Sequence, residues 1–360
     1  MVENILTASI IGGSVAGILG VILILVDKFV ADYGSCEIKI NADKIITVEG
    51  GKNLLETLQE EKIFIPSSCG AKGSCGLCKV KINEGGGDIL PTEIPHLTKS
   101  EMQSNIRLAC QVKVRRDLEI SLPEWILNLK PRFAKVIEIN DLNYDTKSIV
   151  LDPEEPLKFI PGQYIQIQIP KTQEYRAYSI ASSTREKNIE LIIRQVPGGL
   201  CSTYIHEQLT LGDELGFLGP CGDFTFKTDS GNEIILIAGG SGLAVMKSIL
   251  KWCFENGIER RITLFFGAVA KDDLFLMDEL TEWEKKYNNF TFIPALSNPA
   301  HHDVWSGERG LITEVVERNI SDASNKEAYL CGSPNMIDAA VTSLKKIGFP
   351  DENIFCDRFS

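Results

Sequence analysis

The sequence predicts a multidomain chain with an N-terminal transmembrane helix, a small mixed β domain, an antiparallel β-barrel and an α/β domain built on a parallel sheet. Three observations lead to this expectation. The chain opens on a long uncharged run, its middle shows short strands separated by Pro and Gly, and strands alternate with helices from about residue 231 onward. The expected domain boundaries are 1–30, 31–125, 131–230 and 231–360.

The uncharged run extends from Ile5 to Val26, which is 22 residues. At about 1.5 Å per residue it would span the roughly 30 Å hydrocarbon core of a bilayer. No positive residue precedes it, which disfavours a cleaved signal peptide. Small residues recur at every fourth position on two adjacent lines, Ser9–Gly13–Gly17 and Gly12–Ala16–Gly20. Such a face lets a neighbouring helix approach closely, although glycine is common in membrane helices in any case.

Charge and cysteine content narrow the classes of partner and cofactor. The formal net charge of −12 would repel nucleic acid, so no nucleic-acid partner is expected. Three of the ten cysteines, Cys69, Cys75 and Cys78, fall within ten residues. Such crowding fits a metal site better than a disulfide framework.

The first folded domain is expected to contain one helix, capped by Asn53, and several strands. These strands are expected at 36–40, 45–48, 79–82, 109–114 and 118–122. The cysteine spacing Cys69-x5-Cys75-x2-Cys78-x31-Cys110 supplies four thiolates, three from one loop and one from a distant strand. That arrangement predicts a [2Fe-2S] cluster, although the first interval is one residue longer than the plant-type x4. Zinc would usually require a second Cys-x-x-Cys pair or histidines.

The middle of the chain is expected to hold a flavin. Strands at 134–139, 164–169 and 189–194 predict the antiparallel barrel. On a further extended segment, Arg176 can pair with a phosphate, Tyr178 can stack on the flavin ring, and the Ser179 hydroxyl can bond its reactive nitrogen. A glycine-led turn then precedes an expected helix at 203–208 and forms a phosphate cradle that includes Gly199, Cys201 and Ser202. Each motif alone is weak, and their spacing inside one predicted domain carries the expectation.

The last domain is expected to bind a nicotinamide nucleotide at the carboxyl ends of its parallel strands. Strands are expected at 234–238, 262–266, 290–293 and 328–331, and helices at 243–256, 274–286, 311–318 and 336–346. Gly239, Gly240 and Gly242 follow the first strand, where a pyrophosphate would meet a helix N-terminus or where the chain simply turns. Cys331 and Gly332 end a later strand, where the thiol can face nicotinamide or be a small buried residue. Asp272 and Asp273 would repel a 2′-phosphate, which favours NADH over NADPH.

In this order the motifs resemble the ferredoxin-reductase superfamily. Over essentially the whole chain they resemble the family of the F subunit of sodium-translocating NADH:quinone reductases. That family shares the C-x5-C-x2-C loop, a segment similar to residues 84–93, and a fourth-ligand strand similar to residues 107–111. The resemblance implies a β-grasp [2Fe-2S] ferredoxin domain and NADH as hydride donor. It further implies FAD bound through Arg176, Tyr178, Ser179 and Ser202, with Phe359 covering the flavin.

The function implied is an NADH-dependent oxidoreductase that passes electrons to quinone or another redox subunit, in a single-pass protein of the cytoplasmic (inner) membrane with its soluble domains on the cytoplasmic side. Residues 5–26 would contact other membrane subunits. Two alternatives stay open: a reductase component that serves a separate oxygenase or other redox partner, and a membrane-tethered ferredoxin-like carrier without NADH activity. Departures from the family, such as Cys-Gly-Ser-Pro at 331–334 and the lack of an insertion between Ser179 and Gly199, concern membership of a sodium pump rather than NADH oxidation.

Overall fold

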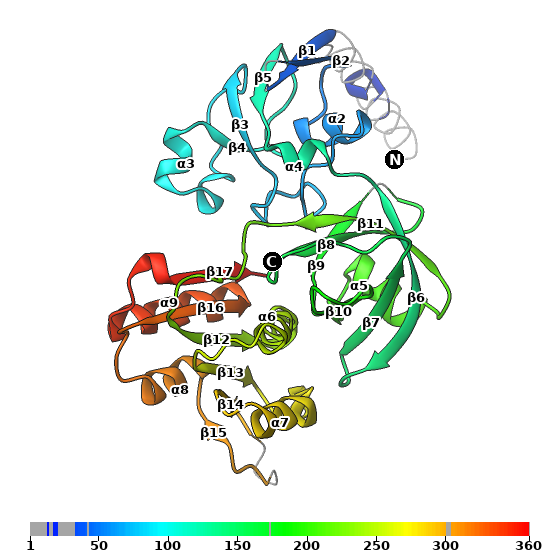
Figure 1. Cartoon of the computed structure of the whole chain (residues 1–360). Coiled ribbons are helices and arrows are strands. Elements are labelled where there is room, and N and C mark those ends of the chain that lie inside the picture. The colour runs from blue at the N-terminus through cyan, green and yellow to red at the C-terminus, as the bar shows by residue number, and fades with distance from the viewer. Residues whose placement is uncertain are drawn as a thin grey trace, which may run out of the picture. The chain divides into compact units, whose positions relative to one another are not determined.

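The computed structural model describes residue 13 and residues 17–20, 33–41, 43–172, 174–299 and 304–359 (Figure 1). The membrane helix expected at 5–26 lies almost entirely outside these residues, so it stays a prediction. Within the described ranges, no helix is both long and apolar enough to cross a bilayer. The chain divides into two compact units. Residues 1–65 and 71–129 form the first, and residues 66–70 and 130–360 form the second.

The first unit contains a mixed five-stranded sheet with the order β2-β1-β5-β3-β4. Its strands are β1 (Ser35–Ile40), β2 (Lys44–Glu49), β3 (Lys79–Glu84), β4 (Ile106–Leu108) and β5 (Leu118–Ser121), and its helices are α2 (Leu54–Glu60), η1 (Ile94–His96), α3 (Lys99–Gln103) and α4 (Glu124–Leu127). Among these described strands, only β1 and β5 run parallel. The Asn53 side chain accepts a hydrogen bond from the Glu56 amide, which confirms the predicted cap of α2. Leu54 and Leu58 of α2 pack into the same core as Ile38 and Ile120.

One predicted strand of this unit is wrong. The sequence predicts an extended segment at 109–114, but the strand here is β4 and ends at Leu108. The chain turns immediately afterwards because the amides of Gln111 and Val112 both donate to the Leu108 carbonyl, at 2.8 and 3.2 Å. The Ala109 and Val112 carbonyls instead accept hydrogen bonds from the start of α2. Cys110 therefore lies in a turn after the strand, not within one.

In the second unit, residues 132–221 form an antiparallel six-stranded sheet with the order β10-β7-β6-β11-β8-β9. Its strands are β6 (Arg132–Asp141), β7 (Thr146–Pro153), β8 (Tyr164–Gln168), β9 (Tyr175–Ser179), β10 (Ile189–Arg194) and β11 (Glu214–Cys221), with helix α5 (Leu200–Glu207). Ile149, Ile167 and Leu191 are among the fully buried side chains of its core.

The predicted closed barrel is corrected by this sheet. Among the described residues, edge strands β9 and β10 meet only at an isolated bridge between Ile180 and Leu191, not along a ladder. The chain leaves the sheet after this bridge because the next residues bond to the following domain. The Ser182 carbonyl accepts a hydrogen bond from the Ser248 hydroxyl at 2.9 Å, and the Ser183 hydroxyl bonds to Glu255. The predicted antiparallel pairing is confirmed, whereas the predicted closure of the sheet into a barrel is wrong.

The rest of the second unit is an α/β domain whose sheet pairs in parallel throughout, with the order β15-β14-β13-β12-β16-β17. Its strands are β12 (Glu233–Gly239), β13 (Ile262–Ala268), β14 (Phe290–Leu296), β15 (Glu308–Arg309), β16 (Lys326–Gly332) and β17 (Ile354–Arg358). Its helices are η2 (Gly240–Gly242), α6 (Leu243–Glu255), η3 (Lys271–Asp273), α7 (Met277–Lys286), α8 (Ile312–Asn319), α9 (Pro334–Ile347) and η4 (Asp351–Asn353). The predicted parallel sheet is thus confirmed.

Alternate residues of the central strands pack on opposite faces of this sheet. Leu236 and Phe266 lie in the core beneath α6, whereas Ile237 and Phe265 lie in the core beneath α8 and α9. Both faces are therefore buried, as a parallel sheet requires. Helix α7 begins at Met277 rather than at 274 because Leu276 takes a left-handed conformation with φ of 57°.

Candidate functional site

The predicted cluster loop is folded by glycines. Gly73 and Gly76 have φ angles of 74° and 69°, in the left-handed region that disfavours side-chain-bearing residues. A Cβ atom on Gly73 would lie 2.7 Å from Nε2 of Gln111, and one on Gly76 would lie 2.9 Å from Cβ of His96. The loop is thus packed against both the turn that carries Cys110 and the segment around His96. This close packing explains why glycines alternate with cysteines there.

One thiol of this loop, that of Cys78, interacts with the thiol of Cys110 in the turn after β4. The interaction of Cys78 with the Cys110 thiol, together with burial, raises the pKa of Cys78. The Cys110 sulfur lies 3.5 Å from Nε2 of Gln111. Cys69 and Cys75 are partly exposed. In the part of the chain that the structure describes, no three His, Cys, Asp or Glu side chains are grouped so as to hold a metal ion. Thiolate donors on a tight glycine loop nevertheless fit an iron–sulfur cluster.

A buried ion pair positions the Cys110 turn, and the residue pattern alone did not reveal it. The Arg107 guanidinium donates to both Glu93 carboxylate oxygens, with a shortest distance of 2.6 Å, and both side chains are at most 4% exposed. Glu93 also accepts a hydrogen bond from the Leu108 amide at 2.9 Å. Burial opposes ionisation of Glu93, yet Arg107 and the backbone amides keep the pKa of this carboxyl below its usual range. The family-like segment 84–93 is therefore a support for β4.

The two predicted halves of the flavin site converge in the second unit. Tyr178 on β9 packs against the core that contains Cys201, at the start of α5, and the two side chains interact. Burial, with a contribution from Cys201, raises the pKa of Tyr178 well above its ordinary value. Arg176 acts electrostatically on both groups. Ser179 is 7% exposed, in the last pair of the β8–β9 ladder. Residues about 25 positions apart in the sequence thus lie in one region of the domain, which contains a cation and an aromatic ring.

Arg176 and Ser202 already have partners within the protein. The Arg176 guanidinium donates to the Glu174 carboxylate at 2.7 Å and to the Tyr175 carbonyl at 2.8 Å. The Ser202 hydroxyl accepts a hydrogen bond from the Val196 amide at 3.1 Å, which stabilises the turn before α5. A Cβ atom on Gly199 would lie 2.7 Å from the Ser202 oxygen, so glycine is needed for this turn. A phosphate at this helix would therefore compete with contacts that already exist.

The glycine turn after β12 and the loop after β16 are in direct backbone contact. A Cβ atom on Gly242 would lie 2.3 Å from the Cys331 carbonyl oxygen, and one on Gly239 would lie 2.5 Å from the Met336 sulfur. At Gly242, where the neighbouring atoms are backbone, only glycine allows such an approach. Gly240 has a φ angle of 55°. Both predicted nicotinamide motifs thus lie at the carboxyl ends of adjacent strands, which is where parallel sheets bind ligands.

Phe359 and Asp357 join this loop from β17. The Phe359 amide donates to the Gly332 carbonyl at 2.9 Å, which fixes the end of the chain beside the loop. Cys331 is fully buried, and its sulfur lies 3.9 Å from the Asp357 carboxylate. Burial raises the pKa of Asp357 to about 6 and also raises the pKa of Cys331. Sequence reasoning missed Asp357 because β17, which places it opposite Cys331, was not predicted.

Asp272 and Asp273, which follow β13, differ in their contacts. Asp273 accepts hydrogen bonds from the Tyr144 hydroxyl at 2.7 Å and from its own cap amide, that of Ala270, at 2.8 Å. It therefore ties the α/β domain to the antiparallel sheet. Asp272 is exposed. Of the two carboxylates, Asp272 is the one that this packing leaves at the surface.

A second buried cation links the antiparallel sheet to two helices of the α/β domain. Lys247 on α6 is 5% exposed and lies 3.0 Å from both Glu190 on β10 and Glu279 on α7. Burial opposes its charge, but the two carboxylates raise its pKa above the ordinary value. The flavin and nicotinamide motifs are thus held in one compact unit by a charge network, which no local sequence pattern signalled.

Three domain families match the chain in this order. The 2Fe-2S iron-sulfur cluster binding domain matches residues 36–115, the oxidoreductase FAD-binding domain matches 134–226, and the oxidoreductase NAD-binding domain matches 236–342. The predicted cofactors, a [2Fe-2S] cluster, FAD and NADH, are thereby confirmed. The first match includes all four candidate ligands, Cys69, Cys75, Cys78 and Cys110.

Relatives cover nearly the whole chain. The F subunit of the Na(+)-translocating NADH-quinone reductase of Neisseria meningitidis is 34% identical over 95% of this chain and 96% of its own length. The phenol hydroxylase P5 protein of Acinetobacter pittii is 37% identical over 87% and 91%. Among solved structures, the Amycolatopsis cytochrome P450 reductase GcoB superimposes with a TM-score of 0.72 at 28% identity, over 90% of this chain and 98% of its own. This chain belongs to the family of NADH-dependent iron–sulfur flavoproteins that includes the F subunit of the Na(+)-translocating NADH-quinone reductase.

Proposed function

We propose that this chain is the electron-input subunit of a membrane complex, in which it oxidises NADH at FAD and delivers single electrons through its [2Fe-2S] cluster to quinone or another membrane carrier. One observation carries the proposal. Tyr178 interacts with Cys201, and Gly242 lies against Cys331, both within the compact unit that contains residues 130–360, in a chain that also contains the cluster domain. A flavin supplies the change from a two-electron hydride donor to a one-electron acceptor.

The chain's own residues would bind and orient these groups. Arg176 would exchange Glu174 for a flavin phosphate, Tyr178 would lie against the flavin ring, and the buried Ser179 hydroxyl would face its reactive edge. The phosphate turn would contribute Gly199, Cys201 and Ser202. Nicotinamide would enter beside Cys331 and Phe359, with its pyrophosphate against the glycine turn. The glycine turn after β12 would contribute Gly239, Gly240 and Gly242, and the end of β16 would contribute Gly332. The cluster would be held by Cys69, Cys75, Cys78 and Cys110.

Membrane attachment belongs to the same proposal. Residues 5–26 would form a single-pass anchor in the cytoplasmic (inner) membrane, contact other subunits and keep the soluble domains on the cytoplasmic side, where NADH is found. The names of the Na(+)-translocating relatives include sodium translocation and quinone reduction, and the coverage of those relatives supports assigning both to the complex that contains this chain.

A second function has specific support. The relative named phenol hydroxylase P5 protein and the ferredoxin reductase in carbazole 1,9a-dioxygenase, at a TM-score of 0.70 and 28% identity, each align with most of this chain. A reductase component that serves a separate oxygenase would use the same sites. The uncharged run 5–26 favours the membrane complex, because a freely diffusing reductase has no need of an anchor.

The experiment isolates membranes that contain the full chain with its native neighbours. NADH is expected to bleach the flavin absorption, and quinone reduction is expected to follow and to depend on sodium. Flavin bleaching without quinone reduction, in a chain released from membranes without detergent, would favour the oxygenase-reductase function. An absence of bleaching would contradict NADH oxidation itself and support a carrier without NADH activity.

A further inference from the structure

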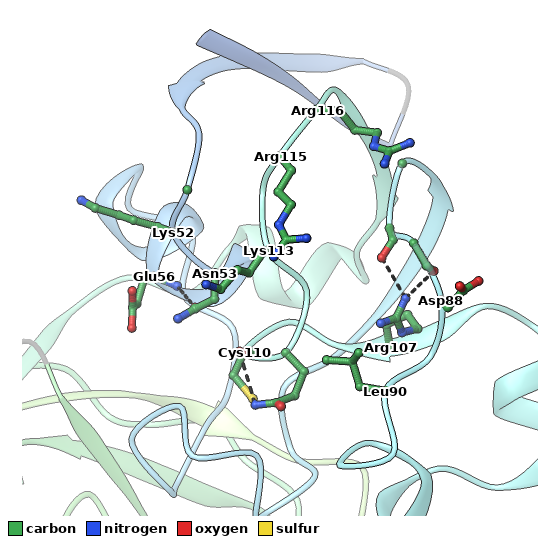
Figure 2. Close-up of a pocket in the computed structure, with 15 residues that line it drawn as sticks. Lys52, Asn53, Glu56, Asp88, Leu90, Arg107, Cys110, Lys113, Arg115 and Arg116 are labelled. Carbon is green, nitrogen blue, oxygen red and sulfur yellow. Dashed lines mark hydrogen bonds between the residues drawn. The ribbon is translucent and has the colours of Figure 1, made fainter. Parts of the chain in front are cut away.

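The first unit contains a groove of about 690 Å³ that the cofactor motifs do not explain (Figure 2). Its lining includes Lys52, Lys113, Arg115 and Arg116, together with Cys110 and Gln111. The groove lies wholly within the first unit, so its shape depends on one compact body.

The groove concentrates positive charge in a protein whose net charge is −12. Lys113, Arg115 and Arg116 are exposed, and within the described residues no carboxylate lies at ion-pair distance from any of them. Lys52 pairs with Glu60 at the surface, and Arg107 is neutralised by Glu93. The lining carboxylates Glu56 and Asp88 only partly offset these charges. Three cations within four residues therefore face solvent on an otherwise acidic chain.

The backbone holds these cations in place. Val112 and Val114 are buried, so the intervening Lys113 and the following Arg115 point outward. The Val114 amide donates to the Lys52 carbonyl at 2.9 Å, and the Val114 carbonyl accepts from the Gly51 amide at 2.7 Å. The Arg115 guanidinium also lies 5.6 Å from the centre of the Tyr33 ring. The segment that carries Lys113 and Arg115 is thus held by backbone hydrogen bonds at Val114.

The groove reaches a predicted cluster ligand. Cys110 (Figure 2) and Gln111 belong to its lining. The Gln111 amide lies 3.5 Å from the Cys110 sulfur. The groove extends from Arg115 and Arg116 past Lys113 to Cys110 (Figure 2), so a partner that filled it would reach the turn through which electrons are proposed to leave the chain. A nucleic acid would be repelled by the rest of the surface. A flat lipid surface would not fill a concave site that contains Cys110.

We propose that this groove docks an acidic segment of the protein that accepts electrons from the cluster. The inference rests on the proposed function, because it presumes that electrons leave through the cluster. Complementary charge raises the rate of encounter and fixes the orientation of two proteins, and this effect weakens with salt. The groove would thus select the acceptor, while the nucleotide sites select the donor.

The test compares two double charge reversals in the full, cofactor-loaded chain. R115E/R116E alters the groove, and K44E/K99E makes the same change in charge on exposed lysines of the same unit that are outside the groove lining. In membranes with the native neighbours, R115E/R116E is expected to lower NADH-dependent quinone reduction about tenfold or more at low salt, with a smaller loss at high salt. K44E/K99E is expected to remain within about twofold of the natural sequence.

A second readout does not require the native acceptor. The pre-reduced cluster is mixed with anionic ferricyanide or cationic hexaamminecobalt(III), and its reoxidation is followed by absorption. R115E/R116E is expected to slow the anion and speed the cation, and to do so more than K44E/K99E. Equal behaviour of the two variants in both assays would overturn the docking proposal. Loss of NADH-dependent flavin bleaching in the natural sequence would instead contradict the proposed function, so the two failures are distinguishable.

Discussion

The cluster domain and the nucleotide-binding unit assemble their functional residues in different ways. For the cluster, three of the four predicted ligands lie within residues 69–78 of the sequence, and the fourth, Cys110, lies in the turn after β4. In the second, the candidate residues extend from Arg176 to Phe359 and come from several separate segments. Iron–thiolate bonds are few and strong, so a short loop suffices to hold a cluster. A dinucleotide is large and is held by many weaker contacts, so several strand ends must converge on it.

Each region also contains a buried ion pair, but the two pairs act over different ranges. Glu93 and Arg107 lie within one domain and fix the strand that leads to Cys110. Lys247 on α6 joins the antiparallel sheet, through Glu190, to helix α7, through Glu279. The first pair therefore controls the geometry of one site, whereas the second controls how two sites meet. Breaking a buried pair leaves an uncompensated charge, which costs more than losing a surface pair.

The largest effect is expected from Cys110→Ala. Removing one of four thiolates should abolish the [2Fe-2S] cluster, because the ligands act as a set. Electron delivery to quinone should fall to background, while NADH should still bleach the flavin. Iron and acid-labile sulfide content, together with stopped-flow flavin absorption, would measure both. Cys36→Ala, which alters a buried cysteine of the same core that is outside the motif, is the matched control. An unchanged iron and acid-labile sulfide content in Cys110→Ala would contradict the proposal that these four thiolates hold the cluster.

A smaller effect is expected from Glu93→Gln, which leaves Arg107 buried without its carboxylate. The cluster domain should lose about 3–5 kcal/mol of stability, measured by denaturant unfolding. Because the folded-state pKa of Glu93 is depressed, its contribution is fully present above the ordinary pKa of 4.5 and is lost as the pH falls through the lower folded value. The natural chain should therefore weaken at acid pH more steeply than Glu93→Gln.

Replacing both partners, as Glu93→Leu with Arg107→Met, should cost less than Glu93→Gln because no buried charge is left unpaired. NADH-dependent flavin bleaching should be unchanged in all of these variants. If Glu93→Gln lowered NADH-dependent flavin bleaching as strongly as it lowered the stability of the cluster domain, the two regions would not act independently.

The smallest effect is expected from Asp357→Asn. Burial raises the folded-state pKa of Asp357 to about 6, from 3.8. Its stabilising contribution is therefore complete below pH 3.8 and is lost as the pH rises through about 6. Asparagine should remove this loss, so the variant should gain up to about 3 kcal/mol relative to the natural chain as the pH rises from about 4 to 7. Thermal unfolding of the flavin-loaded protein at several pH values would measure it, and parallel pH profiles for both proteins would contradict it.

Local motifs were predicted well where the chemistry is local. The cysteine spacing, the Asn53 cap and the parallel strands with their helices follow from residue types at short range, and the structure confirms the cap and the parallel strands. Strand β17 was missed, and segment 109–114 was wrongly predicted to be a strand, because hydrogen bonds to distant residues decide both. The barrel was expected to close because nothing in the sequence indicates that Ser182 and Ser183 bond to α6.

The sequence by itself determined which cofactors the chain can take, since thiolate number, glycine turns and an arginine–tyrosine–serine strand are each tied to one chemistry. Only the tertiary structure decided what lies beside what: Tyr178 against Cys201, Gly242 against the Cys331 carbonyl, and Asp357 against the Cys331 thiol. The physical reason is range. A spacing along the chain fixes geometry over a few residues, whereas burial, close backbone contact and shifted pKa values arise only when distant segments share the same space.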